Sequence, residues 1–194
     1  MTQILILYAH PAQQFSRMNR LLAEVAQRHA SVFFNDLYHH YPNFLVDIER
    51  EQHLLQTHHT IVFQHPLYWY STPAILKEWQ DIVLQPGFAY GEGGEYLRGK
   101  RFTSAITVGG AESEYAVGGH NKNSILDFLL PIRQTMLTCG MSLIDPFVSY
   151  GVHYNANSTV KHSELDRFSD WLNKLGHTEM TAADLATDDM LRLP

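Results

Sequence analysis

Short, continuous runs of apolar residues alternate along this chain with stretches in which apolar residues recur every three or four positions. A continuous run predicts a strand buried on both faces, and the spaced pattern predicts a helix with one apolar face. The runs predict strands at 3–8, 31–37, 60–64, 102–108 and 147–152. Helices are expected after Ser16, after Asp47 and after Thr72-Pro73. Two more are expected over 124–136, with Pro131 as a possible break, and over 163–175.

Strands that alternate with helices in this way predict an α/β fold with a parallel sheet covered by helices on both faces. The simplest doubly wound arrangement of five strands has the order 2-1-3-4-5. We expect residues 1–177 to form this one domain. Residues 178–194, which are rich in acidic side chains, are expected to form a tail or an arm onto a neighbour.

The composition narrows the function classes. Hydrophobic residues make up 45% and charged residues 18% of the 194, an ordinary balance for a globular domain. The formal net charge of −6 disfavours binding to nucleic acids, which requires a basic surface. Cys139 is the single cysteine, so an internal disulfide is excluded and a reducing compartment is expected.

The chain shows no signal sequence and no apolar stretch long enough for a membrane span. We therefore expect a soluble protein of the cytoplasm. Peripheral association with the cytoplasmic face of the inner membrane, through another protein, stays open.

Three strands are followed by loops that carry candidate chemistry. Two of these strands lead into a His-Pro pair, His10-Pro11 and His65-Pro66, and the third ends at Gly109-Gly110. In the order 2-1-3-4-5 these strands are neighbours, and ligands bind beyond the carboxyl ends of the strands. The loops 10–19, 66–72 and 109–120 are therefore expected to build one site.

The first loop offers hydrogen-bond donors at a helix start. Free backbone amides and the positive end of the helix dipole meet there, and Ser16, Arg17 and Asn19 add side chains. This combination suits a phosphate, although an ordinary helix cap explains it equally well. The dinucleotide pattern G-x-G-x-x-G and the P-loop are both absent after the first strand.

The second loop contains three adjacent aromatic residues, Tyr68, Trp69 and Tyr70. Successive side chains point in different directions, so they cannot all enter a core. A flat heterocycle or a subunit interface would use them, and the alternative is a loop that folds over its own helix.

The third loop begins with Gly109 and Gly110, which allow a ligand to approach the backbone closely. Tyr115 and His120 follow and could donate or accept protons. The alternative is a flexible surface loop with a solvated phenol and imidazole.

Other chemistries are disfavoured. The chain has 12 histidines, but the pairs His39-His40 and His58-His59 are adjacent, so their side chains diverge. No H-E-x-x-H pattern or paired cysteines suggest a metal site. The G-x-S-x-G nucleophile motif of many hydrolases is also absent.

At several segments the sequence resembles the flavodoxin-like NAD(P)H dehydrogenase (quinone) family, to which DT-diaphorase belongs. Within it, the chain is most similar to the general stress protein 14 type and to the ancillary subunits of glutathione-regulated potassium-efflux systems. The segments that carry the resemblance are Tyr8-Ala9-His10-Pro11, Asp36-Leu37-Tyr38, Asp47-Ile48-Glu49-Arg50-Glu51-Gln52, Phe63-Gln64-His65-Pro66-Leu67-Tyr68-Trp69-Tyr70-Ser71, Leu76-Lys77-Glu78-Trp79 and Gly99-Lys100.

The resemblance implies a flavodoxin-like fold that binds a flavin, FMN or else FAD. It implies that the phosphate and ribityl chain lie among His10, Ser16, Arg17, Met18 and Asn19. The isoalloxazine ring would contact Leu67, Tyr68, Trp69 and Tyr70, and its pyrimidine edge would contact Thr107, Val108, Gly109 and Gly110.

Tyr115 and His120 resemble the family's tyrosine–histidine pair near the position of hydride transfer. They are five positions apart here, one fewer than in the diaphorase pattern. Val108 stands where a threonine is common, which removes a hydroxyl but leaves the backbone donors.

The resemblance thus implies a two-electron NAD(P)H:quinone oxidoreductase, with NADH or NADPH as co-substrate and a quinone or similar electrophile as acceptor. It also implies a homodimer, to which the loop 67–70 and Phe88-Ala89-Tyr90 would contribute. Two alternatives stay open. One is a regulatory subunit of a membrane potassium-efflux transporter, and the other is a flavodoxin-type electron carrier, whose usual phosphate loop is not seen after the first strand.

Overall fold

The computed structural model of this chain describes residues 3–12, 14, 16–152 and 158–177. A six-stranded parallel sheet forms its centre, in the order β2-β1-β3-β4-β5, with β6 also beside β4. The predicted doubly wound order is confirmed. The strands are β1 (Ile4–Tyr8), β2 (Val32–Asp36), β3 (Thr60–Pro66), β4 (Arg101–Thr107), β5 (Ser142–Leu143) and β6 (Phe147–Ser149).

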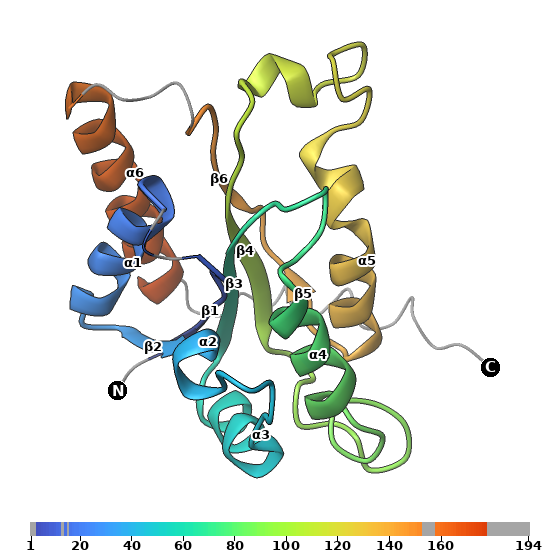
Figure 1. Cartoon of the computed structure of the whole chain (residues 1–194). Helices are drawn as coiled ribbons and strands as arrows, with labels where there is room; N and C mark the ends of the chain where they lie inside the picture. Colours follow the sequence, from blue (N-terminus) through green and yellow to red (C-terminus); the bar gives the residue numbers. More distant parts are fainter. Residues whose placement is uncertain (1–2, 13, 15, 153–157, 178–194) are drawn as a thin grey trace.

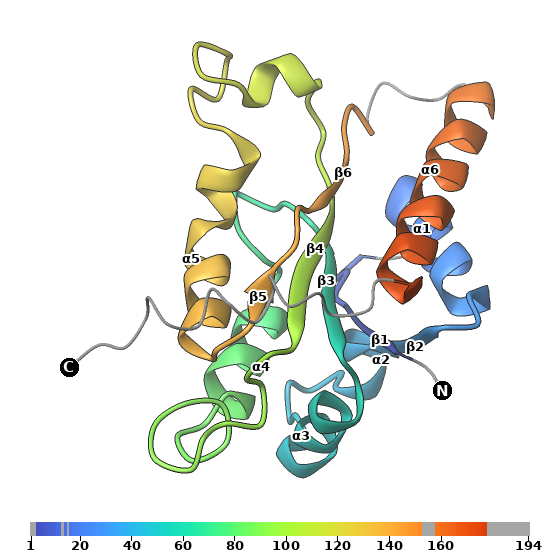
Figure 2. The same ribbon diagram turned by 180° about the vertical axis from the view of Figure 1, so that it is seen from behind.

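Helices cover both faces of the sheet (Figures 1 and 2), so the central strands β1, β3 and β4 are buried throughout. Helices α1 and α6 pack on one face, and the other helices pack on the opposite face. The helices are α1 (Met18–Arg28), α2 (Leu37–His40), α3 (Ile48–Thr57), α4 (Ala74–Val83), α5 (Ile125–Thr138) and α6 (Ser158–His177).

The fifth predicted strand, 147–152, is only partly correct. Its sheet edge consists of two short strands, β5 beside the start of β4 and β6 beside its end. Pro146 lies between them and has no N–H to donate, so the ladder of hydrogen bonds is interrupted there. Thr103 Oγ1 donates to Asp145 O at 3.0 Å and holds the interrupted segment against β4.

Several predicted helix boundaries are also corrected. Thr72 does not cap α4, because the N-cap residue is Pro73 and no side chain completes the cap. Leu37 was predicted to be the last residue of the second strand, but it is the first residue of the short helix α2. Asp36 caps this helix, since its side chain accepts a hydrogen bond from the amide of His39. Helix α5 continues through Pro131, and α6 is longer than the predicted 163–175.

The side of the sheet below α2, α3 and α4 contains a buried carboxylate, Glu51, whose exposed fraction is 0%. Asn35 donates to both carboxylate oxygens at 3.0 and 2.9 Å, Tyr41 donates at 2.6 Å, and the indole N–H of Trp79 donates at 2.9 Å. Arg50 forms an ion pair with the same carboxylate. We call these side chains the Glu51 cluster. It ties β2, α2, α3 and α4 together.

The predicted dimer segment, the single cysteine and the acidic tail are considered next. Phe88 and Ala89 are buried, and Phe88 stacks on Tyr96, so this segment offers only Tyr90 to a partner. Cys139 is buried, and burial raises the pKa of its thiol to about 11. Residues 178–194, the predicted acidic tail, lie outside the described part of the chain. None of the helices that the structure describes has the length and apolar character needed to cross a membrane.

Candidate active site

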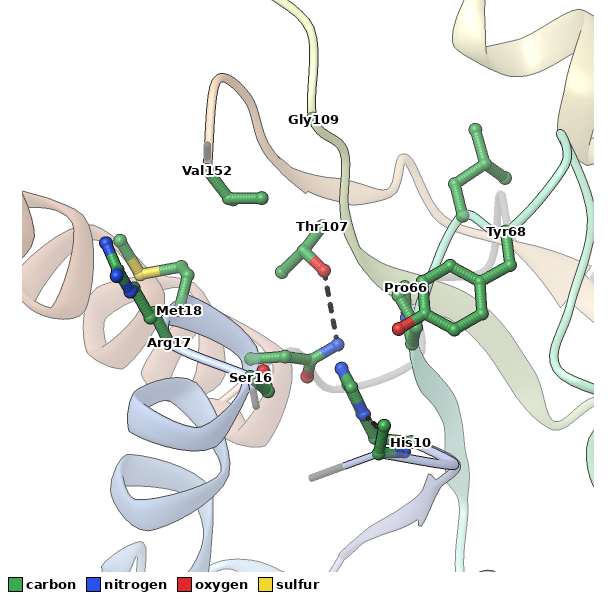
Figure 3. Close-up of a pocket in the computed structure, with 12 residues that line it drawn as sticks. His10, Ser16, Arg17, Met18, Pro66, Tyr68, Thr107, Gly109 and Val152 are labelled. Carbon is green, nitrogen blue, oxygen red and sulfur yellow. Dashed lines mark hydrogen bonds between the residues drawn. The ribbon is translucent and has the colours of Figure 1, made fainter. Parts of the chain in front are cut away.

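A cavity of about 460 Å³ opens beyond the carboxyl ends of β1, β3 and β4. Figure 3 shows it with His10 below, Ser16, Arg17 and Met18 on one side, and Tyr68 on the other. It is lined by His10, Ala12, Ser16, Arg17, Met18, Asn19, Pro66, Leu67, Tyr68, Thr107, Gly109 and Val152. The three predicted loops therefore do meet at one cavity.

The first loop brings the start of α1 to the cavity. Ser16 does not cap this helix, because the N-cap residue is Arg17 and no side chain accepts from the first turn. The first turn also has no acidic side chain. The amides there, together with the positive end of the helix dipole, thus lack a negative partner from a capping side chain and favour an anionic ligand.

His10 is buried at the floor of the cavity. Its Nδ1 accepts a hydrogen bond from the amide of Ala12 at 3.2 Å, so the neutral ring carries its proton on Nε2. Burial lowers the pKa of His10, which favours this neutral form. The imidazole therefore can act as a hydrogen-bond donor through Nε2 without bringing a buried charge.

The second His-Pro pair behaves differently. His65 is fully buried and lies on the opposite face of the sheet, since side chains alternate along β3. Its Nδ1–H donates to Pro66 O at 2.9 Å, and burial lowers its pKa to about 4. Among the described residues, its Nε2 has no hydrogen-bond partner. The repeated dipeptide thus places one histidine in the cavity and the other in the core.

A chain of buried polar side chains joins β3, α1 and β4 at the cavity. Gln64 Nε2 donates to Asn19 Oδ1 at 3.1 Å, and Asn19 Nδ2 donates to Thr107 Oγ1 at 3.2 Å. The second bond is dashed in Figure 3. Because Thr107 Oγ1 accepts from Asn19, its own O–H is available to donate elsewhere. Gln64 Oε1 is buried and has no partner among the described residues. We call Gln64, Asn19 and Thr107 the Asn19 relay.

The aromatic residues of the second loop form a tight turn. The amide of Ser71 donates to Tyr68 O at 3.0 Å, and Tyr68 N donates back to Ser71 O at 3.1 Å. Trp69 and Tyr70, the central residues, have φ values of 48° and 61°, which is typical of a type I′ turn. We call Tyr68 to Ser71 the aromatic turn. Bulky side chains rarely adopt positive φ, so the turn is strained.

The aromatic turn sends its three rings in different directions. Tyr68 lines the cavity and meets the His10 ring edge-on at 5.9 Å between centroids. Trp69 does not line it and is 93% exposed. Tyr70 also lies outside the lining: its ring stacks on Phe128 at 4.7 Å, and its hydroxyl donates to Asn121 Oδ1 at 3.1 Å.

The third loop contributes fewer contacts than the sequence predicted. Thr107 and Gly109 line the cavity, but Val108 is packed in the core and its amide donates to Ser149 O at 2.9 Å. The expected free donor at Val108 is therefore wrong. Gly110 lies beneath the next turn, where an added Cβ would sit 2.9 Å from a carboxylate oxygen of Glu114.

Tyr115 and His120 do not line the cavity. Tyr115 ends the 3₁₀ turn Glu112–Tyr115, where it is half-buried against Phe128 and Tyr150 at centroid distances of 6.3 and 5.9 Å. Burial raises the pKa of Tyr115, so its phenol stays protonated at neutral pH. His120 is exposed further along the segment, which rises above the strand ends in Figure 1.

Four residues of this region were not predicted individually as site residues, although Ala12 and Pro66 lie in two of the predicted loops. Ala12, Pro66 and Val152 line the cavity, and Gln64 supports it from behind. Val152 follows the strand β6, which neighbours β4, so the exit of that strand could have been included with the other three. Gln64 ends the predicted strand 60–64, where a buried polar residue indicates an interior hydrogen bond.

The geometry defines what the cavity can hold. One side offers donors: the α1 amides, Ser16, Arg17, His10 and Thr107. The other side offers the apolar side chains of Pro66 and Leu67 and the ring of Tyr68. Such a site suits an elongated ligand with an anionic end and a planar, partly apolar end. Within the described ranges, no three histidine, cysteine or acidic side chains are placed to hold a metal ion.

Comparison with known proteins supports this reading of the fold. The flavodoxin-like fold family matches residues 2–173. The glutathione-regulated potassium-efflux system ancillary protein KefG of Serratia proteamaculans (strain 568) is 47% identical over 176 residues, which cover 90% of this chain and 96% of that protein.

Three solved structures are similar over most of their length. A thermophilic tryptophan halogenase from Streptomycin violaceusniger has a TM-score of 0.82 and 36% identity, covering 91% of this chain and 99% of that one. General stress protein 14 from Treponema denticola, in complex with FMN, has a TM-score of 0.83 and 28% identity, covering 89% and 99%. An NADPH-quinone reductase from P. pentosaceus has a TM-score of 0.78 and 25% identity, covering 87% and 96%.

The resemblance found in the sequence motifs is thereby confirmed, and the strand order agrees with it. The names of the similar proteins differ, whereas the fold does not. This chain belongs to the family of proteins with a flavodoxin-like fold.

Proposed function

We propose that this protein is an FMN-dependent NAD(P)H:quinone oxidoreductase that transfers two electrons as a hydride from NADH or NADPH to a quinone or a similar electrophile. One observation carries the proposal: the cavity joins an uncapped helix start and donor side chains to a wall of Pro66, Leu67 and Tyr68. FMN has a phosphate at one end and a planar ring at the other, so its shape and charge fit these two sides. The similar protein from Treponema denticola was solved with FMN.

The residues that would hold FMN divide into two groups. His10, Ser16, Arg17, Met18 and Asn19 would surround the phosphate and ribityl chain, with the helix dipole favouring the negative charge. Leu67 and Tyr68 would contact the ring, and Thr107 and Gly109 its pyrimidine edge. Four residues that the resemblance places at the ring do not line the cavity and would support it without direct contact: Trp69, Tyr70, Val108 and Gly110. FMN, when bound, supplies the hydride chemistry.

The protein's own side chains would bind the substrates and control protons. The Asn19 relay leaves the Thr107 hydroxyl free to donate, and this donor would stabilise negative charge at the pyrimidine edge. The Tyr115 phenol stays protonated because burial raises its pKa, so it is suited to donate to the substrate oxygen. We propose His120, in the same segment, as the second proton-handling residue.

The proposal is tested by the visible spectrum of the purified protein, before and after reconstitution with FMN. A bound flavin gives yellow protein that bleaches on addition of NADH or NADPH and regains its colour when a quinone is added. Mass spectrometry of the released flavin separates FMN from FAD. A colourless protein that takes up neither flavin would overturn the proposal.

Replacement of Tyr115 by Phe tests its role separately. Removing the phenol should lower turnover roughly 100-fold, the lower range for a general acid, while flavin content stays unchanged. Loss of flavin instead would mean that Tyr115 is structural.

A second candidate function rests on the 47% identity to KefG over nearly its full length. In that case the protein would bind a potassium-efflux transporter at the cytoplasmic face of the membrane and regulate it, with reductase activity secondary. Co-purification with the transporter and potassium-efflux assays in cells with and without this protein test that function. Efflux that is insensitive to the protein would exclude it.

Two further properties remain proposals. Rapid oxidation of NADH or NADPH by the purified protein would argue against a flavodoxin-type electron carrier, which depends on a separate reductase. A homodimer is proposed from the resemblance, and the exposed side chains Trp69, Leu126 and Leu130 are available to form it. Analytical ultracentrifugation over a range of concentrations would establish or reject the dimer.

A further inference from the structure

Tyr70 is anchored away from the cavity by two different contacts. Its ring stacks on Phe128 of α5, with 4.7 Å between centroids and 27° between planes. Its hydroxyl donates to Asn121 Oδ1 at 3.1 Å. Both partners come from the segment between β4 and the first turns of α5, which is distant in sequence from the aromatic turn.

The partners of Tyr70 in both contacts also contact residues 111–122, which we call the Tyr115 segment. Phe128 also receives the Tyr115 ring edge-on, at 6.3 Å and 86°. The amide of Asn121 donates to Glu114 O at 2.9 Å, at the residue directly before Tyr115. One apolar route and one polar route therefore connect Tyr70 to the backbone and ring of Tyr115.

The conformation of the aromatic turn makes such an anchor necessary. Trp69 and Tyr70 both have positive φ, which a non-glycine backbone maintains only when its surroundings hold it there. Trp69 is almost entirely exposed and offers little packing to hold the turn. Tyr70, with its stacked ring and bonded hydroxyl, is the better-anchored of the two central residues.

We propose that Tyr70 is a positioning residue that fastens the aromatic turn to the Tyr115 segment, so that Tyr68 on the cavity wall and Tyr115 above it are held in one fixed arrangement. The role of this arrangement in turnover rests on the proposed function. The mechanical coupling itself does not, because it depends only on contacts within the chain.

Hydrogen exchange of the flavin-free protein, followed by mass spectrometry, tests the coupling. Tyr70→Phe removes the hydroxyl and keeps the ring, and Asn121→Ala removes its acceptor. We expect Tyr70→Phe to speed exchange in residues 111–122 about threefold to tenfold, the effect of losing one neutral hydrogen bond. Asn121→Ala should speed exchange of the Tyr68 and Ser71 amides reciprocally. The control Gln134→Ala, at an exposed position of α5, should leave both segments unchanged.

Exchange that changes only in the mutated segment, in both variants, would overturn the coupling. Phe128→Leu provides an independent check, because it removes the shared ring and should speed exchange in both segments at once. These outcomes do not require that flavin binds, so they separate the coupling from the proposed reductase function.

The link to turnover is tested with a double-mutant cycle on the flavin-loaded protein. If Tyr70 acts through Tyr115, Tyr70→Phe should lower kcat several-fold in the wild-type background and have no further effect in Tyr115→Phe. Equal effects in both backgrounds would show that Tyr70 acts by another route. The dissociation constant for FMN, measured by fluorescence quenching, should be the same for Tyr70→Phe and wild type.

Discussion

The Glu51 cluster and the Asn19 relay are both buried groups of polar side chains, and they lie on opposite faces of the same sheet. Around Glu51, both carboxylate oxygens accept hydrogen bonds from neighbouring elements. In the Asn19 relay the hydrogen bonds run in one direction, and Gln64 Oε1 is left without a partner among the described residues. The two groups have similar burial, but all the carboxylate oxygens of the first are hydrogen-bonded, whereas the second keeps an acceptor that is not.

This difference indicates different roles. A buried carboxylate with donors on both oxygens stabilises one arrangement of its elements, because each donor depends on the same charge. A relay with an unused acceptor and a free hydroxyl donor has capacity left for a ligand. We therefore propose that the Glu51 cluster stabilises the fold and that the Asn19 relay takes part in ligand binding.

The largest effect is expected from Glu51→Ala. It removes the shared acceptor, so the donors of Asn35, Tyr41 and Trp79 lose the carboxylate they bond. The Arg50 guanidinium loses its counter-charge. Removing one partner of a buried ion pair costs about 3–5 kcal/mol, so the free energy of unfolding should fall by that amount in urea titrations. Glu49→Ala, at an exposed position of the same helix, is the control and should change stability by less than about 0.5 kcal/mol.

A loss of stability as small as that of the control would contradict the structural role of the Glu51 cluster. The affinity of the remaining folded protein for FMN should be unchanged, since these side chains do not line the cavity.

His65 lies on the same face of the sheet as the Glu51 cluster, but its polar atoms are not all hydrogen-bonded. Its Nε2 is buried without a partner among the described residues. Its pKa is about 4 in the folded protein and 6.5 when exposed, so the unfolded chain takes up the proton first as the pH falls. Stability is therefore lost as the pH falls from about 6.5 toward 4. Between pH 7 and pH 5 this histidine should contribute a loss of about 2 kcal/mol.

Urea titrations at the two pH values, on wild type and on His65→Gln, measure this contribution. The wild type should lose about 2 kcal/mol more than the variant. His10 and His58, whose pKa values are also lowered by burial, remain in both proteins and cancel in the difference. Equal losses would show that His65 is already protonated or hydrogen-bonded in the folded state.

The largest change in binding is expected from Asn19→Ala. The relay would lose two hydrogen bonds, a loss of about 1–3 kcal/mol in stability at about 0.5–1.5 kcal/mol each. Thr107 and Gln64 would no longer be oriented, so the affinity for FMN, measured by fluorescence titration, should fall roughly tenfold, equal to about 1.4 kcal/mol. Asn43→Ala, in an exposed loop, is the control. An unchanged affinity would place the ligand elsewhere.

The sequence was sufficient for the strand order and for the meeting of three loops, because both follow from local periodicity and the rules of parallel sheets. It was insufficient for the Glu51 cluster. Glu51 occurs in the first turn of a helix, where a glutamate normally faces solvent. Its donors Asn35, Tyr41 and Trp79 come from other elements, so only the folded chain brings them together.

In the site, too, some positions follow from the sequence and others depend on the folded backbone. The position of His10, Asn19 and Thr107 at the cavity follows from their places after the strands and at the start of α1. The direction of Tyr70 depends on two positive φ angles, which no apolar pattern encodes for a tryptophan and a tyrosine. Pro146, in contrast, was visible in the sequence and explains the divided edge strand once its missing N–H is considered.

The buried thiol of Cys139 has a practical consequence for observing this protein in motion. With a pKa of about 11, the sulfur is almost entirely protonated at neutral pH, and it is shielded from reagents. A cysteine introduced at Val117 or Trp69, where the native side chains are 89% and 93% exposed, would therefore be the dominant target of maleimide dyes. Single-molecule fluorescence could then follow the aromatic turn and the loop 109–120 separately, without prior removal of the native cysteine.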